Sequence, residues 1–264
     1  MIKYIESLQN PKIKLVRSLH QNKGRADAEA FIVEGQINEI PNNWEIKFYL
    51  VSQTFIQKFG IYKYEQRANI FVADDKTFAY ACDTMTPQGI LAVCSKSNAK
   101  ISEKIMDELL KVDNPLFLLM ENTQDPGNLG TVIRTADAAG VTAVFISNGS
   151  VDAFNPKVVR SAAGSIFNLP FFVDIDIVDI VEKLMQNRIN VYAASLDGAT
   201  DLYSLDLSGG CAFIIGNEAR GLSIETIEHC SKAVKIPILG KAESLNASMA
   251  CGILLYEAVR QRHY

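Results

Sequence analysis

The second part of this chain alternates short apolar runs with helical patterns, and this alternation constrains the fold more than any other feature. The apolar runs predict strands at residues 116–120, 143–147, 171–173, 190–194, 212–215 and 233–236. Helical spacing of apolar residues predicts helices at residues 129–139, 156–163, 178–187 and 244–262. Mostly apolar strands alternating with helices indicate a parallel sheet covered on both faces. The sequence therefore predicts an α/β domain built on a parallel sheet.

Three polar loops that contain glycine follow three of these strands. They are residues 125–130 (Asp-Pro-Gly-Asn-Leu-Gly), residues 216–221 (Gly-Asn-Glu-Ala-Arg-Gly) and residues 236–246, which end in Ser-Leu-Asn. Because the carboxyl ends of parallel strands meet at one edge of a sheet, where such proteins bind ligands, we expect one site there. The spacing Gly-x-x-Gly in the first loop fits neither a dinucleotide-binding turn nor a phosphate loop. It therefore disfavours a nicotinamide dehydrogenase or an ordinary nucleoside triphosphatase.

The first hundred residues carry a less regular pattern. Asn10 and Pro11 are typical of a helix start, and an apolar stripe at helical spacing follows them. Short apolar runs predict strands at residues 31–33, 46–51, 70–73 and 89–94, with helix-like patches at 54–59 and 76–81. A polar stretch at 95–100 has the composition of a linker and precedes a helical pattern at 101–110. We expect two domains, residues 1–98 and residues 99–264.

The charge is distributed unevenly along the chain. Its formal net charge is −4, but residues 1–100 carry 13 Lys and Arg against 10 Asp and Glu, whereas residues 101–264 carry 13 against 20. The excess of positive charge is sharpest in the first 25 residues. Charge alone favours a solvated helix face there, and a phosphate-contacting patch is the alternative. The basic residues that would form this patch are Lys12, Lys14, Arg17, Lys23 and Arg25.

The sequence gives no indication of a metal site or of a membrane segment. The five cysteines are scattered without a Cys-x-x-Cys pair, and the three histidines lie far apart, so we expect reduced core thiols and no metal. No apolar run approaches the roughly 18 residues that span a bilayer, and no early stretch resembles a secretory signal. We therefore expect a cytoplasmic protein.

Arg134 lies in the helix predicted after the first loop. Its neighbours Val132, Ile133 and Ala136 are expected to be buried, and a buried guanidinium needs a carboxylate or phosphate partner. This residue is therefore a candidate for function.

At these loops the chain resembles the SpoU (TrmH-like) family of RNA 2′-O-ribose methyltransferases in the SPOUT superfamily. Residues 128–136 resemble the first family motif, with Asn128 and Arg134 at its polar positions. Residues 213–223 resemble the second, with Glu218, and residues 236–257 resemble the third, with Ser244, Leu245 and Asn246. Residues 157–164 resemble the segment between the first two motifs. Residues 7–11, 31–35 and 86–90 resemble the family's amino-terminal RNA-binding domain, which is built like RNA-binding ribosomal proteins.

The resemblance implies a fold and a cofactor. The carboxyl-terminal domain would form a deep trefoil knot, a topology that periodicity could not suggest because knots are rare. S-adenosylmethionine would bind within the knot, held mainly by backbone groups. The residues that the resemblance assigns to it are Ile215, Gly216, Asn217, Ile236 and Leu245.

The resemblance also implies the reaction, in which a ribose 2′-hydroxyl attacks the sulfonium methyl group. The family's proposal makes the arginine of the first motif, here Arg134, the base with help from an RNA phosphate. Clamping that phosphate is the alternative, because a guanidinium is a poor base. Glu218 would hold Arg134 or a neighbouring amide, and Asn128, Ser244 and Asn246 would hydrogen-bond around the ribose and the loops.

We expect large-subunit ribosomal RNA as the substrate, with transfer RNA as the alternative. A non-catalytic RNA-binding protein on the same scaffold is a further alternative. We also expect a homodimer, in which the helix of the first motif and the last helix lie near the contact. The small residues Ala247, Ala250 and Cys251, together with Leu254, would let a partner approach closely.

Overall fold

The computed structural model describes residues 2–35, 37, 40–99, 101–196 and 200–264. These residues divide into two compact units. Unit 1 comprises residues 1–98 and 154–167, and unit 2 comprises residues 99–153 and 168–264. Each unit contains one β-sheet.

Unit 1 is built on a mixed five-stranded sheet in the order β1-β4-β3-β5-β2. The strands are β1 (Ile2–Ile5), β2 (Ala30–Glu34), β3 (Ile46–Ser52), β4 (Ile70–Ala73) and β5 (Ile90–Ser95). β1, β4 and β3 are parallel, and β5 pairs antiparallel with both β3 and β2. The four predicted strands are confirmed to within one or two residues at each end. β1 was not predicted, because only one of its four residues is buried.

The helices of unit 1 are short. They are α1 (Pro11–Leu19), α2 (Asn22–Ala28), α3 (Gln53–Phe59), α4 (Tyr62–Glu65), α5 (Asp75–Ala81) and α8 (Pro156–Ser161). The predicted start of α1 is confirmed, since the Asn10 side chain accepts a hydrogen bond from the Lys12 N–H and Pro11 occupies the first turn. The segment that contains α8 belongs to unit 1 through ring contacts. The Phe154 ring lies 4.6 Å from that of Phe31, and the Phe167 ring lies 5.1 Å from that of Trp44.

Unit 2 is built on a seven-stranded sheet in the order β10-β12-β9-β11-β6-β7-β8. The strands are β6 (Leu116–Met120), β7 (Ala143–Ser147), β8 (Phe171–Ile175), β9 (Asn190–Ala194), β10 (Thr200–Asp201), β11 (Cys211–Ile215) and β12 (Lys232–Lys235). Every pairing between them is parallel. The predicted parallel α/β sheet is confirmed. Central strands β6, β7 and β11 are buried along their whole length, as expected for a sheet covered on both faces.

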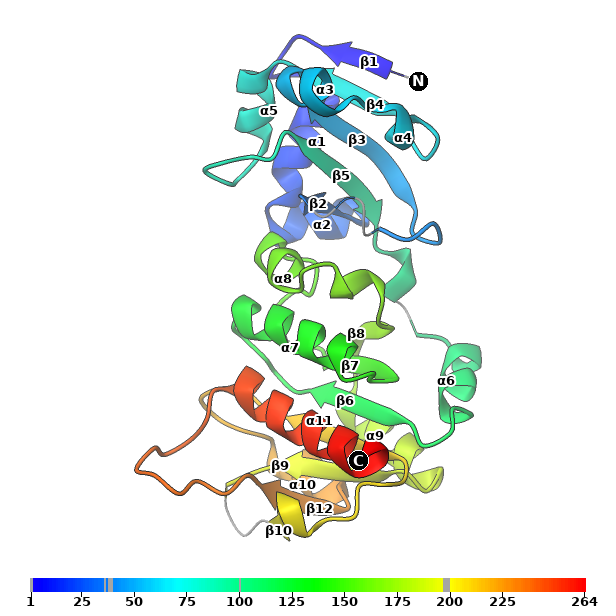
Figure 1. The fold of residues 1–264 in the computed structure, drawn as a ribbon, viewed down its shortest axis with the longest axis vertical. Helices are drawn as coiled ribbons and strands as arrows, with labels where there is room; N and C mark the ends of the chain where they lie inside the picture. The colour runs from blue at the N-terminus through cyan, green and yellow to red at the C-terminus, as the bar shows by residue number, and fades with distance from the viewer. Residues whose placement is uncertain (1, 36, 38–39, 100, 197–199) are drawn as a thin grey trace. The chain divides into compact units, whose positions relative to one another are not determined.

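The helices of unit 2 are α6 (Glu103–Leu110), α7 (Pro126–Ala138), α9 (Ile177–Gln186), α10 (Ile224–His229) and α11 (Ala247–His263). α7 begins three residues earlier than predicted, because Asp125 caps it and Pro126 occupies its first turn. α11 begins three residues later than predicted, because Asn246 is its N-cap. α11 packs beside α7 (Figure 1), where Gly252 leaves room: a side chain there would meet the Thr135 methyl group at 3.7 Å.

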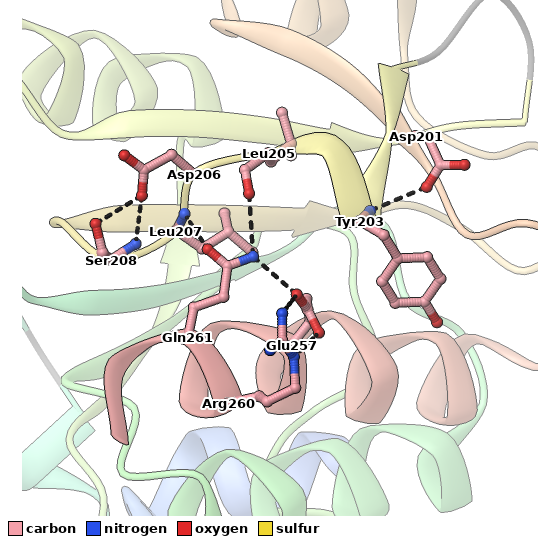
Figure 2. Close-up of polar contacts among 9 residues, drawn as sticks. All are labelled: Asp201, Tyr203, Leu205, Asp206, Leu207, Ser208, Glu257, Arg260 and Gln261. Carbon is pink, nitrogen blue, oxygen red and sulfur yellow. Dashed lines mark hydrogen bonds and ion pairs between the residues drawn. The ribbon is translucent and has the colours of Figure 1, made fainter. Parts of the chain in front are cut away.

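The last turns of α11 are tied to the segment that follows the short 3-10 helix at residues 202–204. The Gln261 amide donates to the Leu205 carbonyl over 3.0 Å and accepts from the Leu207 N–H over 2.8 Å. The Glu257 carboxylate accepts hydrogen bonds from Arg260 and from Gln261, as Figure 2 shows. The two Gln261 contacts fix the carboxyl-terminal helix against residues 205–207 of the same unit.

No helix within the described part of the chain is long and apolar enough to span a membrane. No group of three or more His, Cys, Asp or Glu side chains within the described ranges is arranged to hold a metal ion.

Candidate active site

The three loops predicted to share one edge of the sheet do so. They follow β6, β11 and β12, which run parallel in the sheet of unit 2. A cavity of about 1020 Å³ opens between them. Its lining includes these residues of the three loops: Asp125, Asn128, Ile215, Gly216, Asn217, Glu218, Arg220, Gly221, Ile236, Ser244, Leu245 and Asn246.

The second loop is held in a tight ring. The backbone groups of Asn217 and Gly221 exchange two hydrogen bonds, of 3.0 and 2.9 Å. The Asn217 side chain closes the ring from inside, since its oxygen accepts from the N–H groups of Ala219 and Arg220. A side chain at Gly216 would come within 2.3 Å of the Gly221 carbonyl carbon, so only glycine fits there. The loop is therefore closely packed on itself, and both of its glycines line the cavity.

The first loop is tied to the second. The Asn217 amide donates to the Asn122 carbonyl over 2.8 Å. The Glu218 carboxylate accepts hydrogen bonds from the backbone N–H groups of Gln124 and Asp125, and from the Asn128 amide over 3.2 Å. Glu218 therefore holds neighbouring amides, one of the two roles expected for it, and not Arg134.

The third loop joins the same network. The Asn246 amide donates to the Asn128 side-chain oxygen over 3.0 Å, while its own oxygen accepts from the first N–H groups of α11. Asn246, Asn128 and Glu218 thus form one continuous chain of hydrogen bonds across the three loops. Burial raises the pKa of the Glu218 carboxyl group, but hydrogen bonds from its own backbone, Asn128 and the first loop outweigh this and lower the pKa. The network therefore favours the carboxylate form.

The cavity fits S-adenosylmethionine. All five residues that the sequence assigned to this cofactor line it: Ile215, Gly216, Asn217, Ile236 and Leu245. Its volume lies at the upper end of the range of small-molecule sites. Leu222, Ile227 and Leu254 supply apolar lining suited to a flat base.

Arg134 is not placed as predicted. Its side chain is exposed rather than buried, and it does not line the cavity. It also forms no hydrogen bond or ion pair with the described residues. The reason is helical geometry, because residue 134 points away from the faces that bury Val132, Ile133 and Ala136. Ser244 does line the cavity.

The basic residues of unit 1 divide into two groups. Lys14, Arg17 and Lys23 are exposed, and Lys12 is half-buried with its ammonium 4.6 Å from the centre of the Phe48 ring. Arg25 was wrongly assigned to a phosphate-contacting patch. Its side chain is only 2% exposed and donates to the Leu19 carbonyl at the end of α1.

Arg17 stacks against an aromatic side chain. Its guanidinium carbon lies 4.3 Å from the centre of the Tyr80 ring, and the same group donates to the Tyr80 carbonyl. Arg17 therefore has protein partners as well as exposure to solvent.

Sequence reasoning missed part of the cavity. Ala194 and Ser195 at the end of β9 line it, as do Leu222 and Ile227 around the start of α10. The first pair was detectable, because β9 ends at the same edge of the sheet as the loops. α10 has no apolar stripe at helical spacing, because Thr226 is the one buried residue of its range.

Two family models match the chain. The SpoU rRNA Methylase family matches residues 115–256, and the MRM3-like substrate binding domain matches residues 10–92. The chain belongs to the SpoU rRNA methylase family. The predicted resemblance to SpoU-type RNA 2′-O-ribose methyltransferases is thereby confirmed, together with the α/β fold and the rRNA methyltransferase activity.

Full-length relatives support this SpoU methylase assignment. The 23S rRNA (guanosine(2553)-2′-O)-methyltransferase RlmP of Bacillus subtilis is 35% identical over 97% of this chain and 98% of its own length. The 23S rRNA (guanosine-2′-O-)-methyltransferase RlmB of Pseudomonas putida is 37% identical over 66% of this chain and 71% of its own. The AdoMet-bound rRNA methyltransferase of Sinorhizobium meliloti superposes with a TM-score of 0.83 at 28% identity, covering 98% of each chain. S-adenosylmethionine as the cofactor is confirmed.

Proposed function

We propose that this enzyme methylates the ribose 2′-hydroxyl of a guanosine in 23S rRNA. The observation that carries the proposal is the full-length match to the Bacillus subtilis enzyme, whose name specifies that nucleoside, that RNA and that position on the ribose. The match covers both units of the chain, so it includes the part that matches a substrate-binding domain. Two solved structures that concern tRNA modification match 56% and 61% of this chain, which is less than the 97% matched by the Bacillus subtilis enzyme.

The residues around the cavity divide the work of this reaction. The bound cofactor supplies an activated methyl group, so the protein has to orient the hydroxyl and accommodate its proton. Backbone groups at Ile215, Gly216 and Ile236 hold the cofactor in this proposal. The hydrogen-bonded chain of Asn246, Asn128 and Glu218 keeps the three loops in register beside it.

Arg134 acts on the RNA rather than on the cofactor. It lies six residues beyond Asn128 on α7, roughly 9 Å along the helix axis, and it is exposed without a partner among the described residues. An arginine side chain stays protonated in proteins. We therefore assign Arg134 the role of clamping the phosphate next to the target ribose, in preference to the role of base.

A second subunit would bring Arg134 to a cavity. In one chain this residue lies outside the cavity lining, and α7 packs beside α11, whose outward side chains Met249 and Tyr256 are 62% and 49% exposed. We propose a homodimer that buries this face. The stripe expected to meet the partner was wrong, because Cys251 and Leu254 are buried within their own unit. Light scattering at micromolar concentration tests the dimer, and an active monomer would refute it.

The remaining assignments follow from the substrate. Residues 1–98 form the RNA substrate-binding domain in this proposal, with Lys12, Lys14, Arg17 and Lys23 as phosphate contacts, and residues 99–264 form the methyltransferase domain. We propose a cytoplasmic location, which the similarity to a bacterial rRNA methyltransferase supports.

The test uses the purified full chain with methyl-labelled S-adenosylmethionine and unmodified 23S rRNA. Primer extension at limiting nucleotide concentration stops at 2′-O-methylated residues and locates them. We expect label in 23S rRNA and one new stop at a guanosine. Label in transfer RNA alone, or label on a base without a ribose stop, would contradict the proposal.

A further inference from the structure

One buried carboxylate beside the cavity has no role in the site described so far. Glu121 directly follows β6 and is 7% exposed. Its carboxylate accepts from the Ser223 N–H over 3.0 Å, the Ser223 hydroxyl over 2.9 Å and the Thr226 hydroxyl over 2.8 Å. No cation of the described chain pairs with it. A buried carboxylate is costly unless the protein supplies hydrogen-bond donors to its oxygens.

All three donors come from the segment that leaves the second loop. Ser223 is the N-cap of α10, and Thr226 lies in the first turn of that helix. The entrance to the loop is tied to the same residue, because the Glu121 N–H donates to the Ile215 carbonyl over 2.9 Å. Glu121 therefore holds both ends of the loop formed by residues 216–221, one end through its backbone and the other through its side chain.

The segment held by the side chain contributes to the cavity. Leu222 precedes Ser223, Ile227 follows Thr226, and both line the cavity beside the second loop. Glu121 itself does not line it. The carboxylate thus bonds to Ser223 and Thr226, which are next in sequence to the lining residues Leu222 and Ile227.

We propose that Glu121 is a positioning residue for S-adenosylmethionine, which holds the exit of the second loop and the apolar wall at Leu222 and Ile227 in the binding shape. Its effect passes through hydrogen bonds and not through its negative charge. The inference rests on the cofactor site proposed above.

Two substitutions with side chains of similar length separate the effect of the hydrogen bonds from the effect of the negative charge. Glu121→Met keeps the length and removes all acceptors. Glu121→Gln keeps one acceptor for the Ser223 N–H, and its amide N–H groups can donate to the two hydroxyl oxygens. The methionine leaves three buried donors without their acceptor, so we expect Glu121→Met to raise the Kd for the cofactor at least about tenfold. We expect Glu121→Gln to stay within about threefold of the wild type.

A split between kinetic constants distinguishes positioning from general damage. In Glu121→Met the KM for S-adenosylmethionine should rise with its Kd, while kcat at saturating cofactor stays within about threefold. Glu257 supplies the matched control, since it is also 7% exposed and its carboxylate bonds to Arg260 and Gln261 on its own helix (Figure 2). Glu257→Met should lower stability and leave the cofactor Kd unchanged.

Calorimetric titration of the full chain with S-adenosylmethionine decides the outcome. Unchanged affinity in Glu121→Met would overturn the inference and leave the cofactor site standing, whereas a wild type that fails to bind would overturn that site. Equal losses in Glu121→Gln and Glu121→Met would also overturn it, because charge would then be responsible.

If Glu121→Met does not fold, a substitution of the donor Thr226 tests the same hydrogen bonds. Thr226→Val removes one of the three donors without a change of shape. It should weaken cofactor binding by roughly twofold to tenfold, and unchanged affinity in this folded variant would count against the inference.

Discussion

Arg262 is expected to act as a latch between the carboxyl-terminal helix and the sheet of unit 2. From the last turn of α11 its guanidinium donates to the carbonyl of Leu207 over 3.0 Å and to that of Asn114 over 2.9 Å. It also donates to the Gly209 carbonyl and, over 3.3 Å, to the sulfur of Cys211. These acceptors lie just before or at the start of β6 and β11. One side chain therefore joins the end of the chain to two central strands.

The expected loss on Arg262→Ala follows from these contacts. A hydrogen bond from a charged donor contributes about 1.5–3 kcal/mol, so the bonds to Leu207 and Asn114 alone would give about 3–6 kcal/mol if they were additive and shielded from water. The side chain is half-buried, so water can replace part of each bond. We expect Arg262→Ala to lower the free energy of unfolding of unit 2 by about 2–4 kcal/mol. Arg262→Lys should lose about half of that, because an ammonium group cannot reach all the acceptors of a planar guanidinium.

The assay has to report on unit 2. The only tryptophan, Trp44, lies in unit 1, so its fluorescence is unsuitable. Urea unfolding followed by far-ultraviolet circular dichroism gives the stability, and hydrogen exchange of residues 205–211 locates the change. Arg260→Ala is the control, since among the described residues the Arg260 side chain bonds to Glu257 of the same helix and to no acceptor at residues 205–211. Equal exchange of residues 205–211 in both variants would refute the latch.

Four further predictions test other parts of the molecule. Arg134→Ala should abolish methyl transfer, while the cofactor Kd measured by calorimetry stays within about threefold. Arg134→Lys should restore little activity, because a point charge does not replace a bidentate clamp on a phosphate. Near-normal turnover of Arg134→Ala on the true substrate would contradict this prediction. Reversing the charge at both Lys14 and Arg17 should weaken rRNA binding and flatten its dependence on salt by roughly 0.7–0.9 per lost contact; unchanged affinity and slope would mean that both residues form a solvated face. The pKa of Glu218 is lowered in the folded state from its ordinary 4.5, so its contribution to the free energy of unfolding is complete above pH 4.5 and is lost as the pH falls through the lower folded pKa. In urea titrations, the stability difference between wild type and Glu218→Gln should shrink in that acidic range. A difference independent of pH would contradict the assignment. Thr123 is fully buried and its hydroxyl has no partner among the described residues. Thr123→Val should therefore raise the urea midpoint and increase the free energy of unfolding by about 1 kcal/mol. A lower midpoint would contradict the absence of a partner for this hydroxyl.

The central strands could be predicted from the sequence because their environment is uniform. The ranges for β6, β7 and β9 agree with the structure residue for residue. Each consists mostly of buried apolar residues in a sheet covered on both faces, so most of its residues carry the signal. β10 is two residues long, which is too short for any periodicity, and α10 buries only Thr226 of its range, so it has no apolar stripe.

The two misplaced arginines show what a sequence pattern leaves open. Arg25 lies in α2, which was not predicted, and α2 packs closely on the end of α1: a side chain at Gly24 would come within 2.0 Å of the Ser18 carbonyl oxygen. This close approach carries Arg25 to the Leu19 carbonyl and buries it. Arg134 lies on a helix that was predicted, but its exposure depends on which neighbours cover that face. Composition and spacing do not determine such tertiary contacts.

The three loops were predictable as a site because their polar residues serve the fold as well as the chemistry. Each loop leads to a residue that caps the following helix: Asp125 for α7, Ser223 for α10 and Asn246 for α11. Asn246 does both with one side chain, because its oxygen begins α11 and its amide reaches Asn128. The requirement for a capping residue fixes where each helix starts, and the helix start fixes where the loop ends. The same few residues thus determine where the helices start and which residues line the cavity. A short sequence motif can therefore predict both the helix starts and the site.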